Sequence, residues 1–159
     1  MSDKPLSVAV AVLVRAEKIL LIKRIRGDYV GCWAMPGGKI EKDEHVSSAA
    51  VREILEEAGI KAEFKSHLGL VSEHLRENGQ VLQHFLLHLC ALTSESDQIL
   101  NSQEGALAWF HLSELARMKE QIIPSDYLII EKFVLHPGKN YYECVVEKEG
   151  EKYSLKKFA

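Results

Sequence analysis

Residues 37–60 read GGKIEKDEHVSSAAVREILEEAGI and crowd three carboxylates into two helical turns. The segment from Asp43 to Ala58 has the apolar spacing of an amphipathic helix, and Gly59 is a typical C-terminal stop. At about 100° per residue, Glu53, Glu56 and Glu57 share one narrow face. We expect a second arc to pack on a sheet: Ser47, Val51, Ile54, Leu55 and Ala58. Because like charges at this spacing weaken a helix, either water solvates the acidic face or a cation binds it.

Two neighbouring features favour the cation. Solvated acidic faces are usually interspersed with Lys and Arg, whereas here Arg52 alone flanks the three acids. The turn Pro36-Gly37-Gly38 precedes the helix and lets backbone approach whatever the carboxylates bind. Converging carboxylate oxygens suit Mg²⁺, with Mn²⁺ as the alternative, and such ions neutralise phosphate charge and activate water. The segment therefore predicts a metal site for phosphate chemistry.

The composition of the chain limits its class and its partners. With 159 residues, 47% hydrophobic and 27% charged, it is typical of one soluble globular domain over residues 1–159. There are 23 acidic and 20 basic residues, a net charge of −3, and no long basic run. Nucleic-acid binding depends on clustered Lys and Arg, so we expect a small-molecule partner instead.

The cysteines and the N-terminal region indicate a cellular location. Cys32, Cys90 and Cys144 are far apart, which argues against a disulfide framework or a zinc site and fits a reducing compartment. The apolar run over residues 6–14 is too short to span a bilayer and lacks the layout of a signal peptide. We therefore expect a cytoplasmic protein with no membrane partner. The oligomeric state is left open, with a homodimer among the options.

Predicted strands outnumber helices elsewhere in the chain. Glycine and asparagine turns join most neighbouring strands as hairpins, the clearest at Asn78-Gly79. The expected strands are residues 6–14 and 19–25, buried on both faces, then 64–75, 81–93, 106–111 and two runs around the EKEGE turn at 147–151. Residues 112–118 resemble a helical turn, and Ser125 is expected to cap a helix that ends at Leu135. The expected fold is α+β: a mixed sheet flanked by a few helices, with a C-terminal hairpin over about 140–159.

The spacing of the acidic segment resembles the Nudix box, GX5EX7REUXEEXGU, in which U is a bulky aliphatic residue. Gly38, five residues, Glu44, seven residues and then REILEEAGI from Arg52 to Ile60 meet every defined position. The lead-in CWAMPGG resembles the family's tryptophan-x-x-PGG, and AWFHLSEL resembles its later strand and short helix. One departure is visible, because Lys42 and Asp43 stand where many members have Pro and Gly. A non-glycine residue there can strain the turn but leaves the acids intact.

This resemblance implies a Nudix α/β/α sandwich that hydrolyses a nucleoside diphosphate linked to another moiety, using a divalent metal. The metal ligands that it implies are Glu53, Glu56, Glu57 and the carbonyl of Gly38. Arg52 would hold the glutamates in place, and Glu44 would support the geometry of loop and helix. Glu104 resembles a distant loop glutamate that serves some members as metal ligand or general base. Its alternative role is that of a solvated loop acid.

Residues outside the box set the substrate. Arg24 and Arg26 end the second strand, where they are either solvated or in contact with phosphate. Asp126 follows a Pro, at the place where mutator-type members carry a residue that reads the purine edge, although helix capping is the alternative. Tyr29 is expected in the core or in a pocket wall.

The subfamily marks are few. Marks of dinucleoside-polyphosphate, ADP-ribose and NADH hydrolases are missing after the box, which favours a nucleoside triphosphate, oxidised 8-oxo-dGTP-like purines included. The alternatives are an ADP-ribose or nucleotide-sugar pyrophosphatase and a non-catalytic nucleotide-sensing module. The intact REILEE segment argues against the module, because a sensor has no need of every catalytic ligand.

Overall fold

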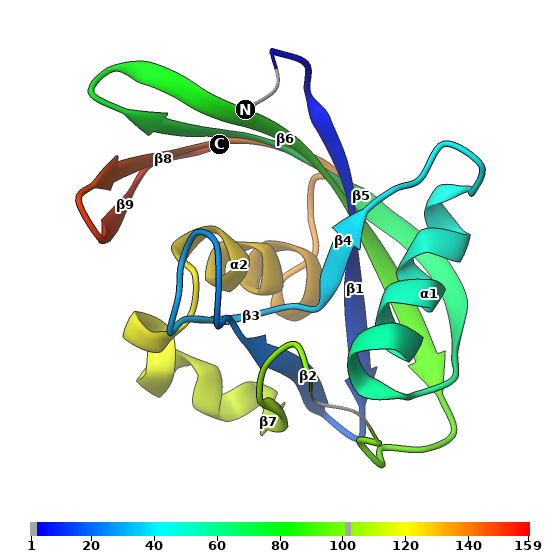
Figure 1. Ribbon diagram of the computed structural model, residues 1–159. Helices are drawn as coiled ribbons and strands as arrows, with labels where there is room; N and C mark the ends of the chain where they lie inside the picture. The colour runs from blue at the N-terminus through cyan, green and yellow to red at the C-terminus, as the bar shows by residue number, and fades with distance from the viewer. Residues whose placement is uncertain (1–2, 101–102) are drawn as a thin grey trace.

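The computed structural model describes residues 3–100 and 103–159 and consists of a curled mixed sheet with helices on both faces (Figure 1). The strands are β1 (Leu6–Arg15), β2 (Lys18–Lys23), β3 (Trp33–Ala34), β4 (Gly37–Lys39), β5 (Ala62–Glu77), β6 (Gln80–Ser94), β7 (Leu107–His111), β8 (Tyr141–Glu149) and β9 (Lys152–Phe158). The helical segments are α1 (Val46–Ala58), the 3₁₀ segment η1 (Leu112–Gln121), α2 (Pro124–Ile129) and its π-helical continuation η2 (Ile130–Leu135). The predicted α+β class is confirmed. None of the described helices is long and apolar enough to cross a membrane.

The strand order is β3-β2-β1-β6-β5-β8-β9, with β4 paired to β1 and β7 paired to β2. The pairs β1–β6 and β5–β8 are parallel and the other pairs are antiparallel, so the sheet is mixed as predicted. Two predicted hairpins are confirmed, β5–β6 and β8–β9. The first turns at Asn78 and Gly79, whose φ angles of 52° and 77° are those of a two-residue turn that matches strand twist.

The predicted N-terminal hairpin is right at its turn but wrong over most of its length. Strands β1 and β2 pair only at Val14–Ile19 and Arg15–Lys18, and then they separate. Beyond that point β1 pairs with β4 and β6, whereas β2 pairs with β3 and β7. The separation opens the sheet between β1 and β2. Ile25, predicted in the second strand, follows its end and is exposed.

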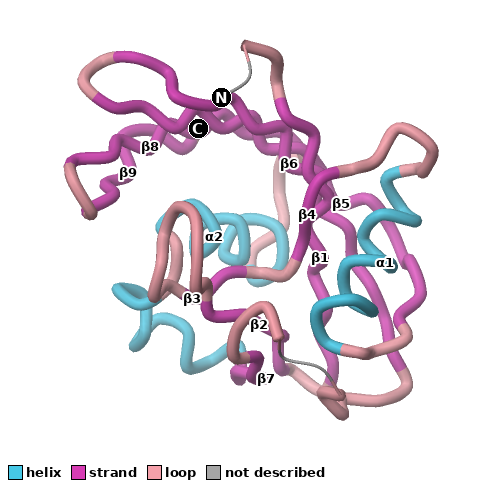
Figure 2. The backbone as a smooth tube through the Cα atoms, viewed as in Figure 1, coloured by secondary structure: helices cyan, strands magenta, loops and turns pink. Residues whose placement is uncertain are grey.

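Strand β1 lies between two cores, which explains why it is buried on both faces. Ala9, Ala11 and Leu13 face α1, whereas Val10 and Val12 face the core that contains α2 and η2. Figure 2 shows α1 and the other helical segments on opposite sides of the strands. Small alanines on β1 let α1 approach the sheet closely, because helix and strand then meet backbone to backbone.

Helix α1 begins at Val46, three residues later than predicted. His45 is its N-cap, without a side-chain bond, and one oxygen of the preceding Glu44 accepts the Glu41 N–H at 3.0 Å. Such a side-chain bond to backbone stabilises a local turn at the expense of helix. The predicted stop is confirmed, since Gly59 has φ 71° and donates its N–H to the Leu55 carbonyl.

The buried face of α1 differs from the predicted one, because it is rotated about the helix axis toward Glu53 and Glu57. Leu55, predicted to pack on the sheet, is 47% exposed, whereas Glu53 and Glu57 are only 9% and 5% exposed. The predicted Ile54 and Ala58 are confirmed in the core on this side of the sheet, with Val51 packed against it, and Ala49 and Ala50 join them. Because small side chains allow the close approach, Glu53 and Glu57 lie against the glycines of β4.

The second helix also differs from its prediction at the start. It begins at Pro124, and its N-cap is Ile123, which has no capping side chain. Ser125 is buried and its hydroxyl instead donates to the carboxyl group of Glu73 on β5. The predicted end at Leu135 is confirmed, because the helix continues into η2.

Candidate active site

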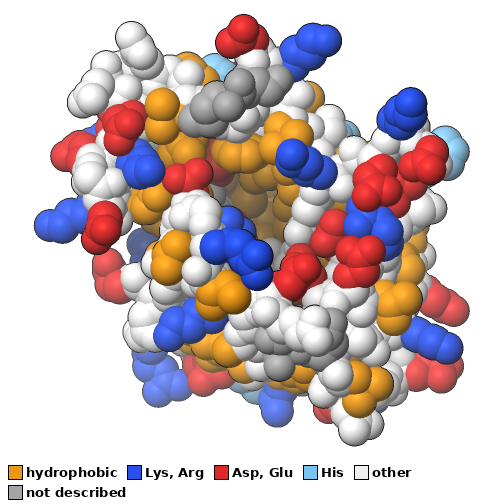
Figure 3. Space-filling model, in the orientation of Figure 1, with side chains coloured by type: hydrophobic (Ala, Val, Ile, Leu, Met, Phe, Trp, Pro, Cys, Tyr) orange, Lys and Arg blue, Asp and Glu red, His pale blue; other side chains and the backbone are white. Residues whose placement is uncertain are grey.

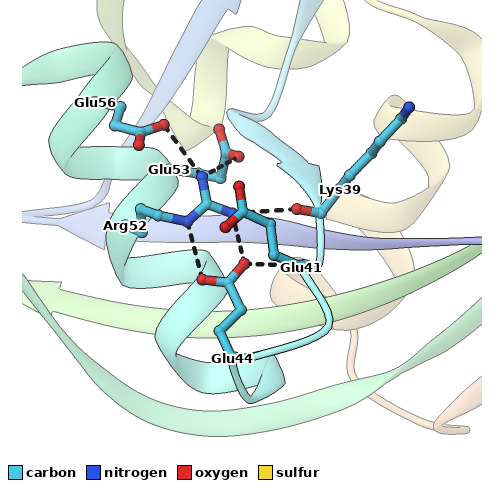
Figure 4. Close-up of polar contacts among 6 residues, drawn as sticks. All are labelled: Lys39, Glu41, Glu44, Arg52, Glu53 and Glu56. Atoms are coloured by element: carbon cyan, nitrogen blue, oxygen red, sulfur yellow. Dashed lines mark hydrogen bonds and ion pairs between the residues drawn. The ribbon is translucent and has the colours of Figure 1, made fainter.

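Arg52 is the centre of the polar cluster on α1 (Figure 4). Its Nε and Nη2 donate to the two oxygens of Glu44, at 2.9 and 2.6 Å. Its Nη1 donates to Glu53 at 2.9 Å and to Glu56 at 3.1 Å, and Nη2 also donates to the Lys39 carbonyl at 3.1 Å. A planar guanidinium can satisfy all these acceptors at once, which a point charge cannot. Arg52 thus links the loop before the helix to two of the three acids.

Glu44 and Arg52 hold each other in their charged forms. The hydrogen bonds from Arg52 are the main cause that lowers the pKa of Glu44 to about 2. The same bonds raise the pKa of Arg52, so both groups carry charge under any working condition. The pair is a fixed brace between the loop and the helix.

Glu53 and Glu57 form a second kind of pair: both are buried, and Glu53 is ion-paired with Arg52. Burial is the main cause that raises the pKa of both carboxyl groups, and for Glu57 the charge of Glu53 adds to it. The two side chains share a hydrogen bond, which requires a proton on one of them. Glu57 also accepts the Gly37 N–H, yet its Oε2 is buried with no partner in the described part of the chain. An unpaired buried carboxyl oxygen is costly and indicates a missing ligand.

Glycines in β4 create the space for these acids. A Cβ at Gly38 would collide with the carboxylate of Glu53, and a Cβ at Gly37 would collide with the Ala9 carbonyl on β1. The pairing of Gly38 with Ala9 fixes this strand against the sheet. The PGG turn of the sequence therefore permits a contact between the backbone of β4 and the side chains of α1.

The carboxylate and carbonyl oxygens of this site are the type of ligand that a hard divalent cation prefers, although the side chains do not converge on one point. Across residues 3–100 and 103–159, no group of three His, Cys, Asp or Glu side chains is arranged to hold a metal. Arg52 donates hydrogen bonds to Glu53 and Glu56. The unpartnered Oε2 of Glu57 and the cradle at Gly38 are nevertheless what an oxygen-liganded Mg²⁺ or Mn²⁺ needs.

A cavity of about 290 Å³ lies beside the acids and brings together residues far apart in the sequence. Glu57 and Gly37 contribute to its lining from α1 and β4, and Glu104 contributes from the loop before β7. Arg24 and Arg26, which follow β2, line the same cavity. Figure 3 shows this face hollowed, with basic side chains opposite acidic ones. Carboxylates thus face guanidinium groups across a space that can hold phosphate.

Gly105 fixes the loop that carries Glu104. Its φ of +145° and its close approach to the Lys23 carbonyl exclude a side chain, and the Lys23 N–H donates to the Ala106 carbonyl at 2.8 Å. The negative charge of Glu104 contributes to raising the pKa of Glu57. The two acids are therefore near enough to interact electrostatically.

A second cavity, of about 260 Å³, adjoins the first and shares Arg24, Met35 and Gly37 with it. Its apolar walls come from strands β1 and β6 and the start of α2: Val8, Val10, Phe85, Leu87 and Ile123. Asp126 lines it too, and its Oδ2 accepts the Met35 N–H at 2.8 Å instead of capping α2. Burial raises the pKa of Asp126 to about 7.

Glu73 is a residue of this second cavity that the sequence analysis missed. It is 4% exposed, accepts the Ser125 hydroxyl, and receives a weak hydrogen bond from the Cys144 thiol at 3.7 Å. Burial raises its pKa. The signal was present, because Val71, Glu73 and Leu75 alternate on the inward face of β5 and only one of them is charged.

Comparison with known proteins gives one consistent family. The model of the NUDIX domain matches residues 4–133. The CTP pyrophosphohydrolase of Escherichia coli is 32% identical over 133 residues, which cover 82% of this chain and 93% of that protein. Human nucleoside diphosphate-linked moiety X motif 6 is 34% identical over 112 residues, 69% of this chain. The matched region is about a third (35%) of that longer relative.

The fold comparison agrees. The crystal structure of the mutator MutT protein from Bacillus halodurans superimposes with a TM-score of 0.70 at 25% identity, and the match covers 94% of this chain and 97% of that one. The predicted sandwich of sheet and helices is confirmed by this likeness.

Proposed function

This chain belongs to the NUDIX family of hydrolases, and we propose that it hydrolyses a nucleoside triphosphate to a monophosphate and pyrophosphate with the help of a divalent metal. The observation that carries the proposal is the first cavity, where Glu57 and Glu104 face Arg24 and Arg26. Acids that can hold a metal and bases that can hold phosphate thus line one space, as phosphoryl transfer requires.

The metal ligands that we propose are Glu53, Glu56, Glu57 and the Gly38 carbonyl, with Glu104 as a further candidate. Bound there, Mg²⁺ or Mn²⁺ would neutralise charge on phosphate oxygens and lower the pKa of a water molecule. Arg52 and Glu44 would keep the α1 carboxylates in position through their bidentate pair. Arg24 and Arg26 would bind the phosphate oxygens directly.

Two acids are candidates to take the proton from the attacking water. Burial raises the pKa of Glu57, and a bound divalent cation would favour the ionised form that a general base needs. Glu104 lies across the same cavity on a loop that Gly105 fixes. Both positions are within the space in which a phosphate would lie, and separate Gln variants distinguish them.

The second cavity is where we propose that the nucleobase binds. Because it shares Arg24 and Met35 with the first cavity, a nucleotide with phosphates in one can reach the other with its base. Asp126 at its wall can accept a hydrogen bond from a base. The likeness to CTP pyrophosphohydrolase over nearly its whole length supports a triphosphate as substrate.

A nucleotide panel tests the proposal. The purified protein is incubated with Mg²⁺ and, in parallel reactions, with CTP, UTP, ATP, GTP, 8-oxo-dGTP, ADP-ribose and UDP-glucose, and phosphate, pyrophosphate and monophosphate are separated. We expect pyrophosphate and monophosphate from at least one triphosphate, and no product in EDTA. Faster cleavage of ADP-ribose or UDP-glucose would replace the substrate class, and no turnover at all would refute an enzyme.

We also propose that residues 1–159 act as one domain, since β8–β9 extends the same sheet through β5. Light scattering after size-exclusion chromatography measures whether the chain is a homodimer. A cytoplasmic location and the lack of a nucleic-acid partner stay predictions of the sequence.

A further inference from the structure

The loop between β2 and β3 has an unusual backbone. Gly27, Tyr29 and Gly31 have φ angles of 76°, 63° and 90°, all left-handed. Glycine adopts this conformation freely, but a tyrosine does so only where its surroundings hold it there. Tyr29 is therefore placed by its contacts, and its side-chain direction is set by them.

The contacts come from the C-terminal hairpin. The Tyr153 hydroxyl on β9 accepts the Tyr29 N–H at 3.3 Å and donates to Asp28 Oδ1 at 3.1 Å. Lys148 Nζ on β8 lies 3.4 Å from the same Asp28 oxygen. The rings of Tyr29 and Tyr153 lie against each other with centroids 4.1 Å apart. The hairpin lies outside residues 4–133, the part of the chain that the NUDIX model matches, and its contacts with Asp28 and Tyr29 are called the clamp below.

Within this clamp, the Tyr29 side chain points into the protein. Tyr29 is 8% exposed and lines the second cavity with Glu73 and Asp126. Its hydroxyl is buried and has no hydrogen-bond partner among the described residues. Burial, and then the charge of Glu73, raise the pKa of Tyr29, so the hydroxyl keeps its proton and is available as a donor. A buried donor without an acceptor is what a ligand can satisfy.

We propose that Tyr29 is a specificity-determining residue, whose hydroxyl donates a hydrogen bond to an acceptor atom of the nucleobase in the second cavity. Tyr153 and Lys148 are positioning residues that hold it there through Asp28. This inference rests on the proposed function, because it takes the second cavity as the base site. The chemistry selects a base that presents an acceptor to Tyr29 and a donor to the carboxyl group of Asp126.

The same loop reaches the phosphate end of the site. Arg24 Nε donates to the Asp28 carbonyl at 2.6 Å, and the Arg24 carbonyl accepts the Gly31 N–H at 2.9 Å. Arg24 lines both cavities. A looser clamp should therefore weaken substrate binding more than it slows the chemical step, because the acids of α1 are untouched.

Tyr29→Phe tests the proposal, since it removes one oxygen and keeps the ring. For the best substrate among CTP, UTP, ATP and GTP, we expect kcat/KM to fall about tenfold through a higher KM. The other three should lose less, so that the differences in kcat/KM among the four nucleotides become smaller. An active Tyr29→Phe enzyme with unchanged ratios of kcat/KM among the four nucleotides would overturn the inference. Binding of the four nucleoside monophosphates in EDTA, measured by calorimetry, gives the same comparison without turnover.

Tyr153→Phe tests the clamp, and Tyr141→Phe is its matched control. The Tyr141 hydroxyl is on the same hairpin but donates to Glu143 at 3.0 Å and is exposed. We expect Tyr153→Phe to raise KM and to reduce the differences in kcat/KM among the four nucleotides, and Tyr141→Phe to change neither. Equal effects of both would reduce the clamp to general support of the fold.

These outcomes separate the two levels of the inference. Lack of hydrolysis by the wild type would refute the proposed function. The monophosphate titrations would still test Tyr29 in that case, because equal affinities for all four bases in wild type and variant would refute its role.

Discussion

The acid cluster on α1 and the second cavity are neighbours, but the chain builds them in opposite ways. Every residue of the cluster comes from residues 38–57, and its geometry follows from helix spacing and one turn. The second cavity takes residues from β1, the loop after β2, β5, β6 and α2. The difference teaches that the acids of α1 are arranged by local sequence, whereas the proposed base site depends on how distant segments pack.

The two regions also neutralise their acids differently. Arg52 compensates Glu44, Glu53 and Glu56 through direct ion pairs. Glu73 in the second cavity has only neutral partners, a hydroxyl and a thiol. A cluster of ion pairs can bind a metal and phosphate, while buried donors and acceptors such as Tyr29 and Asp126 can bind the edge of a base.

The largest effect that would test this contrast is expected at Glu57. Glu57→Gln should lower kcat by about 10³-fold for every nucleotide alike, because it removes a ligand or base but no selectivity. Glu56→Gln should also lower kcat by orders of magnitude. Turnover, together with melting followed by circular dichroism, measures both effects, and exposed Glu63→Gln is the control. Near-wild-type rates in both variants would remove these acids from the site.

Metal binding should stabilise the first region without touching the second. We expect Mg²⁺ at a hundred times its dissociation constant to add about 2.7 kcal/mol to the free energy of unfolding, reversed by EDTA. The gain should be largely lost in Glu57→Gln and kept in Tyr29→Phe. Thermal scans with and without metal measure it, and a wild type unaffected by millimolar Mg²⁺ and Mn²⁺ would contradict the metal site.

Arg52→Lys should produce an intermediate effect. Lysine keeps the charge but cannot make the bidentate bonds to Glu44 while bridging to Glu53, so we expect a loss of about 10- to 100-fold in kcat. The ranking of bases should stay as in the wild type. Arg15→Lys, at an exposed arginine bonded to the Ser94 carbonyl, is the matched control. A changed ranking would show that the two regions are not separable.

Asp126→Asn should have the smallest effect, confined to selectivity. We expect a change of about fivefold in the relative kcat/KM of two bases, the value of one hydrogen bond. Because burial raises the pKa of Asp126 to about 7, the wild-type ranking should change across that pH and the variant ranking should not. A pH-independent ranking in the wild type would dismiss the role.

The same substitution carries a stability prediction with a definite sign. The raised pKa means that folded Asp126 holds its proton after the unfolded chain has lost it. Its contribution to stability is therefore present at low pH and falls as the pH rises from about 4 to about 7. In urea titrations, the free energy of unfolding of Asp126→Asn should therefore depend less on pH over that range than that of the wild type.

What the sequence could predict follows the same division. The spacing of Arg52 from Glu53 and Glu56 needs only helix geometry, so their shared face was predictable. The degree of burial of Glu53 was not, because it depends on Ala9, Ala11 and Ala50 meeting across two elements. Ser125 illustrates the limit, since it follows Pro124 like a cap but lies where Glu73 offers a buried acceptor.

The second cavity was predictable only in part. Asp126 was singled out by its place after a proline. Neither of its two predicted roles, helix capping and base recognition, included the hydrogen bond that it accepts from the Met35 N–H. The Tyr29 clamp involves residues more than 120 positions apart, which no local pattern reports. Such contacts become visible only when the sheet order is known.

The parallel pairs of the sheet have a consequence for how the chain reaches its native state. Pairing of β1 with β6 closes the long stretch of chain that contains α1 and β5, and pairing of β8 with β5 closes another long stretch. Closing such large loops is slow, whereas β5–β6 can form early around Asn78-Gly79. We therefore expect refolding in milliseconds to seconds, with the β5–β6 hairpin formed before the parallel pairs.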